Sequence, residues 1–474
     1  MSDYKMTIGL EIHAELKTRT KMFCGCINSP EEKEPNIYIC PVCMGHPGTL
    51  PVINKKAVKK VLLVGTALGS GLADFTEFDR KNYFYPDIPK GYQISQYKYP
   101  LVIGGSLLGV EITRVHLEED TARSTHDTPG KSLVDFNRAG VPLMELVTEP
   151  VIHSADEAVS FAKELQLLLQ YLDVSNANME KGEMRVEVNL SISKTSEFGT
   201  KVEIKNLNSF RAVGRAIEYE YKRQSELLDK RELVVQETRG WDENKNSTFS
   251  QRSKENANDY RYFPDPDLPK LILSEIPEFS HSILVGELPE LPKEKRERFL
   301  DFYGLKKEDV DFYINNPKWA SFFEEVVKSF GDNKDLIQTS SNYITSDMVG
   351  LSKVRGLEEL SFGKVTAKEF ASIIDLIQKG DLSSRGAKDI LKILFEEGGE
   401  VDIIAKEKNL IQKNDVDELN KIMKKIIEDN PNVVSEYKGG KESTLQFFVG
   451  QGMKETKGSA NPEVLKSIAL ELLK

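Results

Sequence analysis

Apolar and polar residues alternate strictly in the first strand-like stretch of the chain, residues 7–16. Because successive side chains of a β-strand point to opposite faces, this alternation predicts a strand with one apolar and one polar face. The polar face carries Glu11, His13 and Glu15 together. A half-buried strand with a merely wet polar face gives the same pattern, so these residues alone do not establish a site. The apolar positions are Ile8, Leu10, Ile12, Ala14 and Leu16.

A second predicted strand, residues 141–147, is apolar except for Glu145 near its middle. A buried carboxylate is strongly disfavoured unless it is paired or binds a metal, which makes Glu145 a candidate site residue. Upstream, residues 101–115 predict a hairpin that turns at Gly104 and Gly105. The hairpin leads directly into an acidic segment. This segment contains Glu118, Glu119 and Asp120.

Helical patterns appear in two settings along the chain. Ser154 with Glu157, and Thr366 with Glu369, have the capping-box spacing that opens a helix. Prolines between residues 289 and 292 separate a mixed region from a wholly helical one. The predicted fold class is α+β, with a mixed α/β domain followed by a helical domain and a small helical tail. The expected domains are residues 1–290, 291–410 and 411–474.

Length and composition agree with this division. A chain of 474 residues exceeds what one hydrophobic core supports and favours about three domains. Its 39% hydrophobic and 29% charged residues are typical of a globular protein. No signal-peptide segment follows Met1 and no apolar run spans a bilayer, so we expect a cytoplasmic protein. The net charge of −11 disfavours non-specific coating of nucleic acid, although residues 438–474, with six lysines and four acids, are locally basic.

All four cysteines of the chain fall within one short segment, in a C-x-C pair followed by a C-x-x-C pair. In a cytosolic chain, clustered thiols bind metal more often than they form disulfides. Four thiolates in two turns suit tetrahedral zinc, and a closed four-sulfur site is structural rather than catalytic. Redox-active or spare thiols are the alternative, because C-x-C is the less usual spacing. The residues are Cys24, Cys26, Cys40 and Cys43.

Two loops, residues 78–87 and 259–267, combine charged and aromatic side chains. Loops held by a rigid scaffold often carry function, but a packed turn with aromatic anchors is an equal alternative. The familiar nucleotide-binding motifs are absent from the sequence. Residues 130–132 read Gly-Lys-Ser, but Thr125 stands where a P-loop requires glycine. If this protein uses ATP, it therefore binds it at a less familiar kind of site.

The acidic residues of three segments are candidates for one metal site. Glu11 and His13 share a strand face, the segment from Glu118 to Asp120 follows a strand, and Glu145 interrupts another. Carboxylate oxygens, completed by water and phosphate, are the ligands that Mg²⁺ prefers. Composition and spacing therefore indicate a possible acidic metal site, but they do not identify a substrate.

The motifs together resemble one protein family, the B subunits of aspartyl/glutamyl-tRNA amidotransferases. The resemblance extends over the whole chain, including the tail residues 450–458 and 460–462. So many long motifs in one order make coincidence a poor explanation. The other matching segments are residues 9–13, 40–43, 78–87, 90–96, 116–120, 137–143, 203–210 and 259–268.

The resemblance implies a cradle-shaped first domain, a helical domain and a tail domain that binds tRNA. It implies an ATP-dependent reaction in two steps, on Glu attached to tRNA(Gln) or Asp attached to tRNA(Asn). The side-chain carboxylate is activated as an acyl phosphate, and ammonia then displaces phosphate. The ammonia comes from glutamine hydrolysed by a partner A subunit and reaches the site of amidation through an internal channel. A small C subunit is the usual third member of the complex.

By the family pattern, Glu11, His13, Glu119 and Glu145 match the Mg²⁺ site of this reaction, and Glu118 is a neighbour. Two segments depart from the family. Arg123 stands where relatives have lysine after the acidic segment, and residues 185–189 read Arg-Val-Glu-Val-Asn instead of Arg-Cys-Asp-Ala-Asn. Some relatives lack the zinc cysteines, which implies a structural role for zinc.

A second class of function fits part of the same sequence. A non-catalytic subunit for tRNA binding or assembly would use the cysteine cluster and the basic tail as its working parts. Buried Glu145 and the polar face of the first strand favour the enzyme. ATP hydrolysis with and without misacylated tRNA discriminates the two classes. The sequence does not choose between Glu-tRNA(Gln) and Asp-tRNA(Asn) as the cellular substrate.

Overall fold

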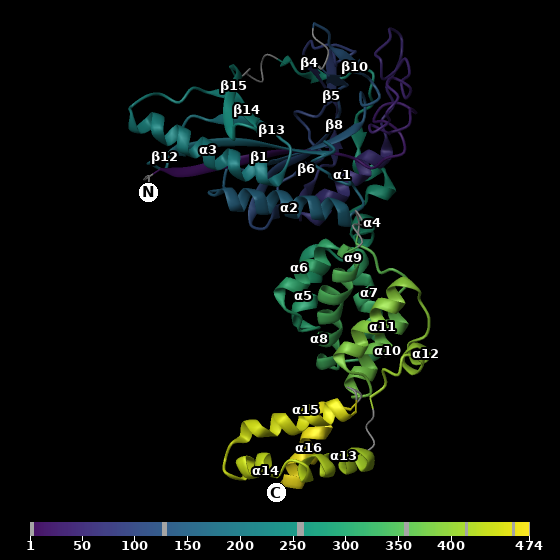
Figure 1. The fold of residues 1–474 in the computed structure, drawn as a ribbon. Coiled ribbons are helices and arrows are strands. Elements are labelled where there is room, and N and C mark those ends of the chain that lie inside the picture. Colours follow the sequence, from purple (N-terminus) through teal and green to yellow (C-terminus); the bar gives the residue numbers. More distant parts are fainter. Residues whose placement is uncertain are drawn as a thin grey trace. The chain divides into compact units, whose positions relative to one another are not determined.

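The computed structural model describes residues 4–125, 130–253, 260–354, 360–412, 416–456 and 460–473. The chain forms two compact units, Met1–Pro292 and Lys293–Lys474. The first contains all the described strands and the second is helical, as Figure 1 shows. The predicted α+β class is therefore confirmed. Asp259, Lys457 and Gly458, which belong to predicted loop and tail motifs, lie outside the described residues.

A large sheet dominates the first unit, and β1 (Lys5–Glu15) lies near its centre. The strand order is β15-β14-β13-β12-β1-β11-β8-β6-β2, and β7 pairs with β8 beside this path. β1 pairs antiparallel with β11 (Pro142–Thr148) on one side and with β12 (Met184–Ser193) on the other. The remaining strands of the sheet are β2 (Gly71–Leu72), β6 (Val102–Ile103), β7 (Ser106–Leu107), β8 (Val110–Glu119), β13 (Val202–Leu207), β14 (Glu237–Asp242) and β15 (Ser247–Ser253).

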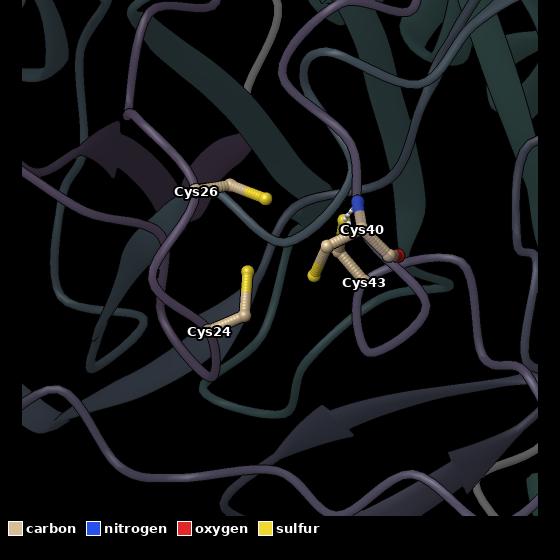
Figure 2. Close-up of side chains that lie close together, drawn as sticks. All are labelled: Cys24, Cys26, Cys40 and Cys43. Carbon is tan, nitrogen blue, oxygen red and sulfur yellow. Dashed lines mark hydrogen bonds between the residues drawn. The ribbon is translucent and has the colours of Figure 1, made fainter.

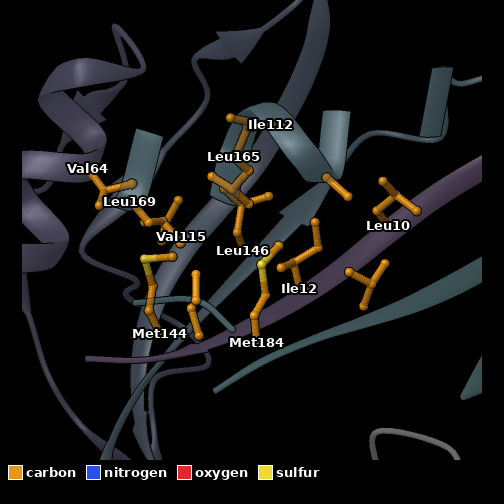
Figure 3. Packing of buried hydrophobic residues seen from close by; sticks show 14 of the residues in the cluster. Leu10, Ile12, Val64, Ile112, Val115, Met144, Leu146, Leu165, Leu169 and Met184 are labelled. Atoms are coloured by element: carbon orange, nitrogen blue, oxygen red, sulfur yellow. The ribbon is translucent and has the colours of Figure 1, made fainter. Parts of the chain in front are cut away.

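Three helices cover the apolar face of this sheet: α1 (Lys55–Ala67), α2 (Ala155–Tyr171) and α3 (Phe210–Asp229). The alternation in β1 is the reason, since Ile8, Leu10 and Ile12 all face the helices and are fully buried. Figure 3 shows Leu10 and Ile12 packed among side chains of β8, β11, β12, α1 and α2. Burying one such side chain stabilises the fold by about 1.5–3 kcal/mol. The opposite face is left for polar residues.

Local capping starts the helices where the sequence predicts. The Ser154 hydroxyl accepts a hydrogen bond from the Glu157 backbone N–H (3.1 Å), and the Glu157 carboxylate accepts from the N–H of His153 (2.9 Å). In the second unit, the Thr366 hydroxyl accepts from the Glu369 N–H (3.2 Å) at the start of α10 (Ala367–Gln378). Both predicted N-caps are confirmed, but the reciprocal half of each box differs, since the Glu369 carboxylate accepts from the Val401 N–H and that of Glu157 from the N–H of His153.

Three short strands form a separate sheet beside the large one, in the order β16-β4-β5. Their bounds are Phe263–Pro264, Asp79–Asn82 and Tyr92–Ser95. This sheet brings the aromatic loop after β4 next to residues 260–264, far away in sequence. Two further pairs are β9 (Arg123–Thr125) with β10 (Leu133–Asp135), and β3 (Phe75–Thr76) with β17 (Leu271–Ile272). α4 (His281–Gly286) lies near the end of this unit.

The second unit consists of short helices, and residues 416–473 within it have an apolar cluster of their own, built around Leu419, Phe448 and Leu465. Among the described residues, no helix is long and apolar enough to cross a membrane. The helices are α5 (Pro292–Asp301), α6 (Lys307–Asn315), α7 (Pro317–Val327), α8 (Lys334–Asn342), α9 (Val349–Val354), α10, α11 (Ser384–Glu396), α12 (Val401–Glu407), α13 (Val416–Glu428), α14 (Pro431–Lys438), α15 (Leu445–Glu455) and α16 (Pro462–Leu473).

Candidate functional site

The polar face of the large sheet gathers carboxylates and imidazoles around Glu145. Strand register sets the arrangement, because His13 on β1 and His116 on β8 both lie directly opposite Glu145 on β11. Their Nε2 atoms are 3.4 Å and 3.3 Å from the Glu145 carboxylate. Glu145 is only 6% exposed. The buried carboxylate expected from the sequence is therefore held between two histidines.

Glu11 and Glu118 complete this group, which we call the acidic cluster: Glu11, His13, His116, Glu118 and Glu145. The Nε2 atom of His13 is 3.7 Å from a Glu118 oxygen and 3.9 Å from a Glu11 oxygen. Ligand atoms of Glu11, His13 and Glu145 lie within 4.8 Å of one another, and so do those of His116, Glu118 and Glu145. Carboxylates and imidazoles within this distance fit a divalent cation with oxygen and nitrogen ligands.

The electrostatics of the acidic cluster also favour a cation. Burial, followed by the charges of Glu145 and Glu187, raises the pKa of Glu11 to about 7. Burial alone would raise the pKa of Glu145 too, but the adjacent His116 and His13 hold it well below its usual range. Burial opposes the charge on His13, yet its hydrogen bond to Glu145 and the nearby carboxylates raise its pKa to about 9. The charge of His13 thus offsets part of the negative charge of these carboxylates.

Glu119 does not belong to the acidic cluster, although the sequence groups it with Glu11, His13 and Glu145. Its Oε1 atom accepts hydrogen bonds from the Lys90 ammonium and from the Ile94 backbone N–H, the latter at 2.9 Å. The reason is strand geometry, since adjacent residues of β8 point to opposite faces of the sheet. Glu118 is the member of the pair that faces His13.

His116 is a cluster residue that the sequence analysis leaves without a role. The sequence did contain a signal for His116, because His116 and Glu118 are two positions apart and therefore share a strand face.

A third acidic group lies on the same face of the sheet, where ligand atoms of Glu11, Glu187 and Glu203 come within 4.8 Å of one another. Lys205 lies beside it and is 2.7 Å from a Glu187 oxygen.

Asp120, the last residue of the acidic segment, is paired with two arginines and lies outside the acidic cluster. Its carboxylate is 2.6 Å from the Arg138 guanidinium and 3.2 Å from that of Arg185. Burial opposes the charged form, but the two guanidinium groups keep the pKa of Asp120 lowered. Arg185 in turn lies opposite His13 in the sheet register. Asp120 therefore holds the Arg138 and Arg185 side chains at the edge of the acidic cluster.

The four cysteines come together in loops that follow β1. Figure 2 shows Cys24 and Cys26 from one segment facing Cys40 and Cys43 from a turn. All four are free thiols, and their sulfur atoms lie within 4.8 Å of one another. Tetrahedral zinc, with Zn–S bonds of about 2.3 Å, needs sulfurs in this range. The cysteine cluster therefore fits the predicted zinc knuckle.

Two further contacts suit thiolate ligands in the cysteine cluster. The Cys43 sulfur accepts a hydrogen bond from the Cys40 backbone N–H at 3.1 Å. The fully buried Lys21 ammonium lies 3.9 Å from the same sulfur. A hydrogen bond from Cys24 is the main cause that lowers the pKa of Cys43 to about 5, whereas the same hydrogen bond raises the pKa of Cys24 and burial raises that of Cys26 to about 11. A cavity next to this cluster is also lined by Lys90 and Glu119.

Comparison with known proteins identifies the family. Residues 6–277 match the model of the GatB/GatE catalytic domain, and residues 321–473 match the GatB domain. The chain is 44% identical to the B subunit of aspartyl/glutamyl-tRNA(Asn/Gln) amidotransferase from Caldicellulosiruptor saccharolyticus and to that from a Thermoanaerobacter species. It is 42% identical to the corresponding protein of Thermodesulfovibrio yellowstonii. Each alignment covers 99% of both chains. The chain belongs to the GatB family of amidotransferase B subunits.

Proposed function

We propose that this chain performs the ATP-dependent amidation step on Glu-tRNA(Gln), Asp-tRNA(Asn) or both. The acidic cluster is the observation that carries the proposal, because it gathers carboxylates and imidazoles able to hold a metal ion, with His116, Glu118 and Glu145 buried, within the unit that matches the catalytic domain. The relatives are named for aspartyl/glutamyl-tRNA(Asn/Gln) amidotransferase activity, which supports the choice of substrate.

The reaction needs activation because a carboxylate has no good leaving group for attack by ammonia. In the first step, a side-chain carboxylate oxygen of the attached Glu or Asp attacks the γ-phosphorus of ATP, and ADP leaves. In the second step, ammonia attacks the carbonyl carbon of this acyl phosphate. The bond to phosphate breaks, a proton is lost from nitrogen, and the amide and inorganic phosphate remain. The ammonia is supplied by glutamine hydrolysis in the partner A subunit.

Glu11, His13, Glu118 and Glu145 would hold Mg²⁺ at this site, with His116 as a further ligand or orienting group. Bound there, Mg²⁺ would neutralise charge on phosphate oxygens as the phosphoryl group is transferred. The strand register fixes these side chains before substrate binds, so little reorganisation is needed at the moment of reaction. Glu119, which is paired with Lys90, is a neighbour of the site and is not proposed as a ligand.

The remaining parts of the chain would support this chemistry. The cysteine cluster would bind one structural Zn²⁺, because a closed four-thiolate site leaves no open position for substrate. Residues 411–474 would contact tRNA as a tail domain, after a cradle domain of residues 1–290 and a helical domain of residues 291–410. The complete enzyme would be a cytoplasmic heterotrimer with the glutaminase A subunit and the small C subunit.

Amidation by the purified complex tests the proposal directly. The complex is given ATP, glutamine and either Glu-tRNA(Gln) or Asp-tRNA(Asn), and formation of the amidated product is measured. We expect product and ADP to form together, and to form also when ammonium chloride replaces glutamine. Uncharged tRNA is the control and should give no such ADP release. Amidation without ATP consumption would contradict the proposal, and absence of amidation on both charged tRNAs would favour the non-catalytic tRNA-binding role.

A further inference from the structure

Five tyrosines form a continuous line of ring contacts, which we call the tyrosine belt. Its members come from three separate segments of the chain, yet each ring touches the next. The ring centroids are 6.1 Å apart for Tyr85–Tyr83, 5.9 Å for Tyr83–Tyr260, 6.1 Å for Tyr260–Tyr262 and 4.3 Å for Tyr262–Tyr97. The last pair is stacked with an interplanar angle of 11°. The predicted aromatic loops are therefore parts of one surface.

The small sheet β16-β4-β5 holds the belt in place. Arg80 on β4 binds the Asp265 carboxylate at 2.7 Å and lies 4.3 Å from the centre of the Tyr92 ring. The Asn82 side-chain amide donates to the carbonyl of Arg261 at 2.8 Å, which ties the loop after β4 to residues 260–264. These contacts are made within the chain, so the belt is preorganised.

The belt borders the acidic cluster through strand β5, and Lys81 lies among the belt rings. The Lys81 ammonium lies 5.2 Å from the centre of the Tyr260 ring and 5.9 Å from that of Tyr83. The Tyr83 hydroxyl donates a hydrogen bond to the Gln93 side chain at 2.9 Å, and Ser95 on the same strand donates to the Glu118 carboxylate at 3.2 Å. A ligand on the belt would thus lie next to the groups proposed to activate the carboxylate.

Both ends of the belt are exposed. Tyr85 is 52% exposed and Tyr97 is 53% exposed, and Phe84 beside Tyr85 is 77% exposed. Exposed aromatic faces interleaved with cations are the combination that binds single-stranded nucleic acid, because every base offers a stacking face and every phosphate a negative charge. Lys81 is the cation placed among the belt rings, whereas Arg80 contacts Tyr92 and Phe263 beside the belt and is paired with Asp265 and Asp267.

We propose that the tyrosine belt binds the unpaired nucleotides at the 3′ end of the charged tRNA by base stacking. The inference rests on the proposed function and adds a binding surface for the end of the tRNA that carries the reacting amino acid. ATP also offers an adenine, but it offers one base, whereas the belt presents rings at two exposed ends. A single strand that carries several bases next to the acidic cluster fits this layout better.

Substitution of the exposed rings in the full three-subunit enzyme tests the inference. Tyr97→Ala and Tyr85→Ala should each raise the KM for charged tRNA about tenfold, the usual size of a lost base–aromatic stack. The KM for ATP should remain at the wild-type value. Tyr97→Phe keeps the ring and should behave as wild type. Phe198→Ala is the matched control, because Phe198 is 71% exposed and lies between β12 and β13, outside the belt.

A fluorescent probe reads the stacking itself. Charged tRNA with 2-aminopurine at its 3′-terminal position should lose fluorescence when it binds wild-type enzyme, and lose less with Tyr97→Ala. A rise in the KM for ATP with an unchanged KM for tRNA would assign the belt to the ATP base and overturn the inference. Unchanged values for both substrates would overturn it as well. In either case the wild-type enzyme still amidates tRNA, so the proposed function stands apart from this result.

Discussion

The first unit contains two clusters of metal-ligand residues that are built in different ways. The acidic cluster is formed by three neighbouring strands, and its members face one another because of their pairing register. The cysteine cluster is formed by loops after β1, where no strand register fixes the sulfur atoms. Within the acidic cluster, Nε2 of His13 and Nε2 of His116 lie 3.4 Å and 3.3 Å from the Glu145 carboxylate. The thiolates of the cysteine cluster have one buried ammonium, Lys21, as a neighbour.

This difference indicates how each cluster depends on its ion. The core and the sheet hold the acidic ligands whether or not a cation binds, so a change there should alter chemistry and leave the fold intact. The loops that carry the cysteines are held by turn hydrogen bonds and one isolated bridge rather than by a strand ladder, so zinc should supply part of their folding free energy. The predictions below separate activity from stability on this basis.

The largest expected effect is on activity, from Glu145→Gln. The substitution keeps the side-chain volume but removes the negative charge shared by both ligand groups of the acidic cluster. Charge stabilisation by a bound metal is worth several kcal/mol, so amidation should fall by at least ~100-fold. On the proposed function, glutamine hydrolysis takes place in another subunit, so its basal rate should persist. Rates of Gln-tRNA or Asn-tRNA formation by the purified complex measure the effect.

Glu118→Gln and Glu119→Gln form a matched pair of controls for this prediction. The two residues are adjacent on β8 but face opposite sides of the sheet, so only Glu118→Gln should weaken Mn²⁺ binding, as measured by the rise in melting temperature on adding the ion. A folded Glu145→Gln complex that amidates tRNA at nearly the wild-type rate would contradict the assignment of the acidic cluster. Thermal melting of each variant separates lost chemistry from lost fold.

Much of this site was predictable from the sequence because its local signals are strong. Alternation in β1 predicts the polar face of Glu11 and His13, and the apolar run around Glu145 predicts a buried carboxylate; both expectations agree with the structure. The four cysteines are close in sequence, so their meeting was visible in their spacing.

Other features depend on more than local pattern. The resemblance assigns Glu119 to the Mg²⁺ site, and this assignment stays a prediction; in the structure Glu119 is bonded to Lys90 and Ile94, whereas Glu118 and His116 share the face of His13. The tyrosine belt could not be predicted from the sequence, because pairing between strands that are distant in sequence brings Tyr97 and Tyr262 together. Such pairing has no signature in the spacing of either segment. Local patterns predict the face a residue occupies, whereas neighbours across a sheet depend on the complete strand order.

The next effect is on stability, from Cys43→Ser. Removing one of four thiolates should lower zinc occupancy and destabilise the first unit by more than about 2 kcal/mol, the range expected for loss of a metal site. Elemental analysis of the wild-type protein, purified without chelators, should give about one zinc per chain, and melting curves should show the loss of stability. Zinc well below this ratio in the wild type would contradict the structural site. A Cys43→Ser variant that keeps its stability but loses amidation would contradict the assignment of stability to the cysteine cluster and of chemistry to the acidic cluster.

The smallest effect is expected in the tail, where charge is carried by exposed lysines. Lys438 and Lys454 are exposed, whereas Lys441 is 2.9 Å from a Glu436 oxygen. If the tail contacts tRNA phosphates, the double variant Lys438→Ala/Lys454→Ala should raise the KM for charged tRNA a few-fold and flatten the dependence of binding on salt, because fewer phosphate contacts release fewer counterions. Lys222→Ala is the matched control, an exposed lysine on α3 paired with Glu226. Equal salt slopes in the double variant and wild type would show that these lysines only solvate the helical surface, and would leave tRNA recognition to the first unit.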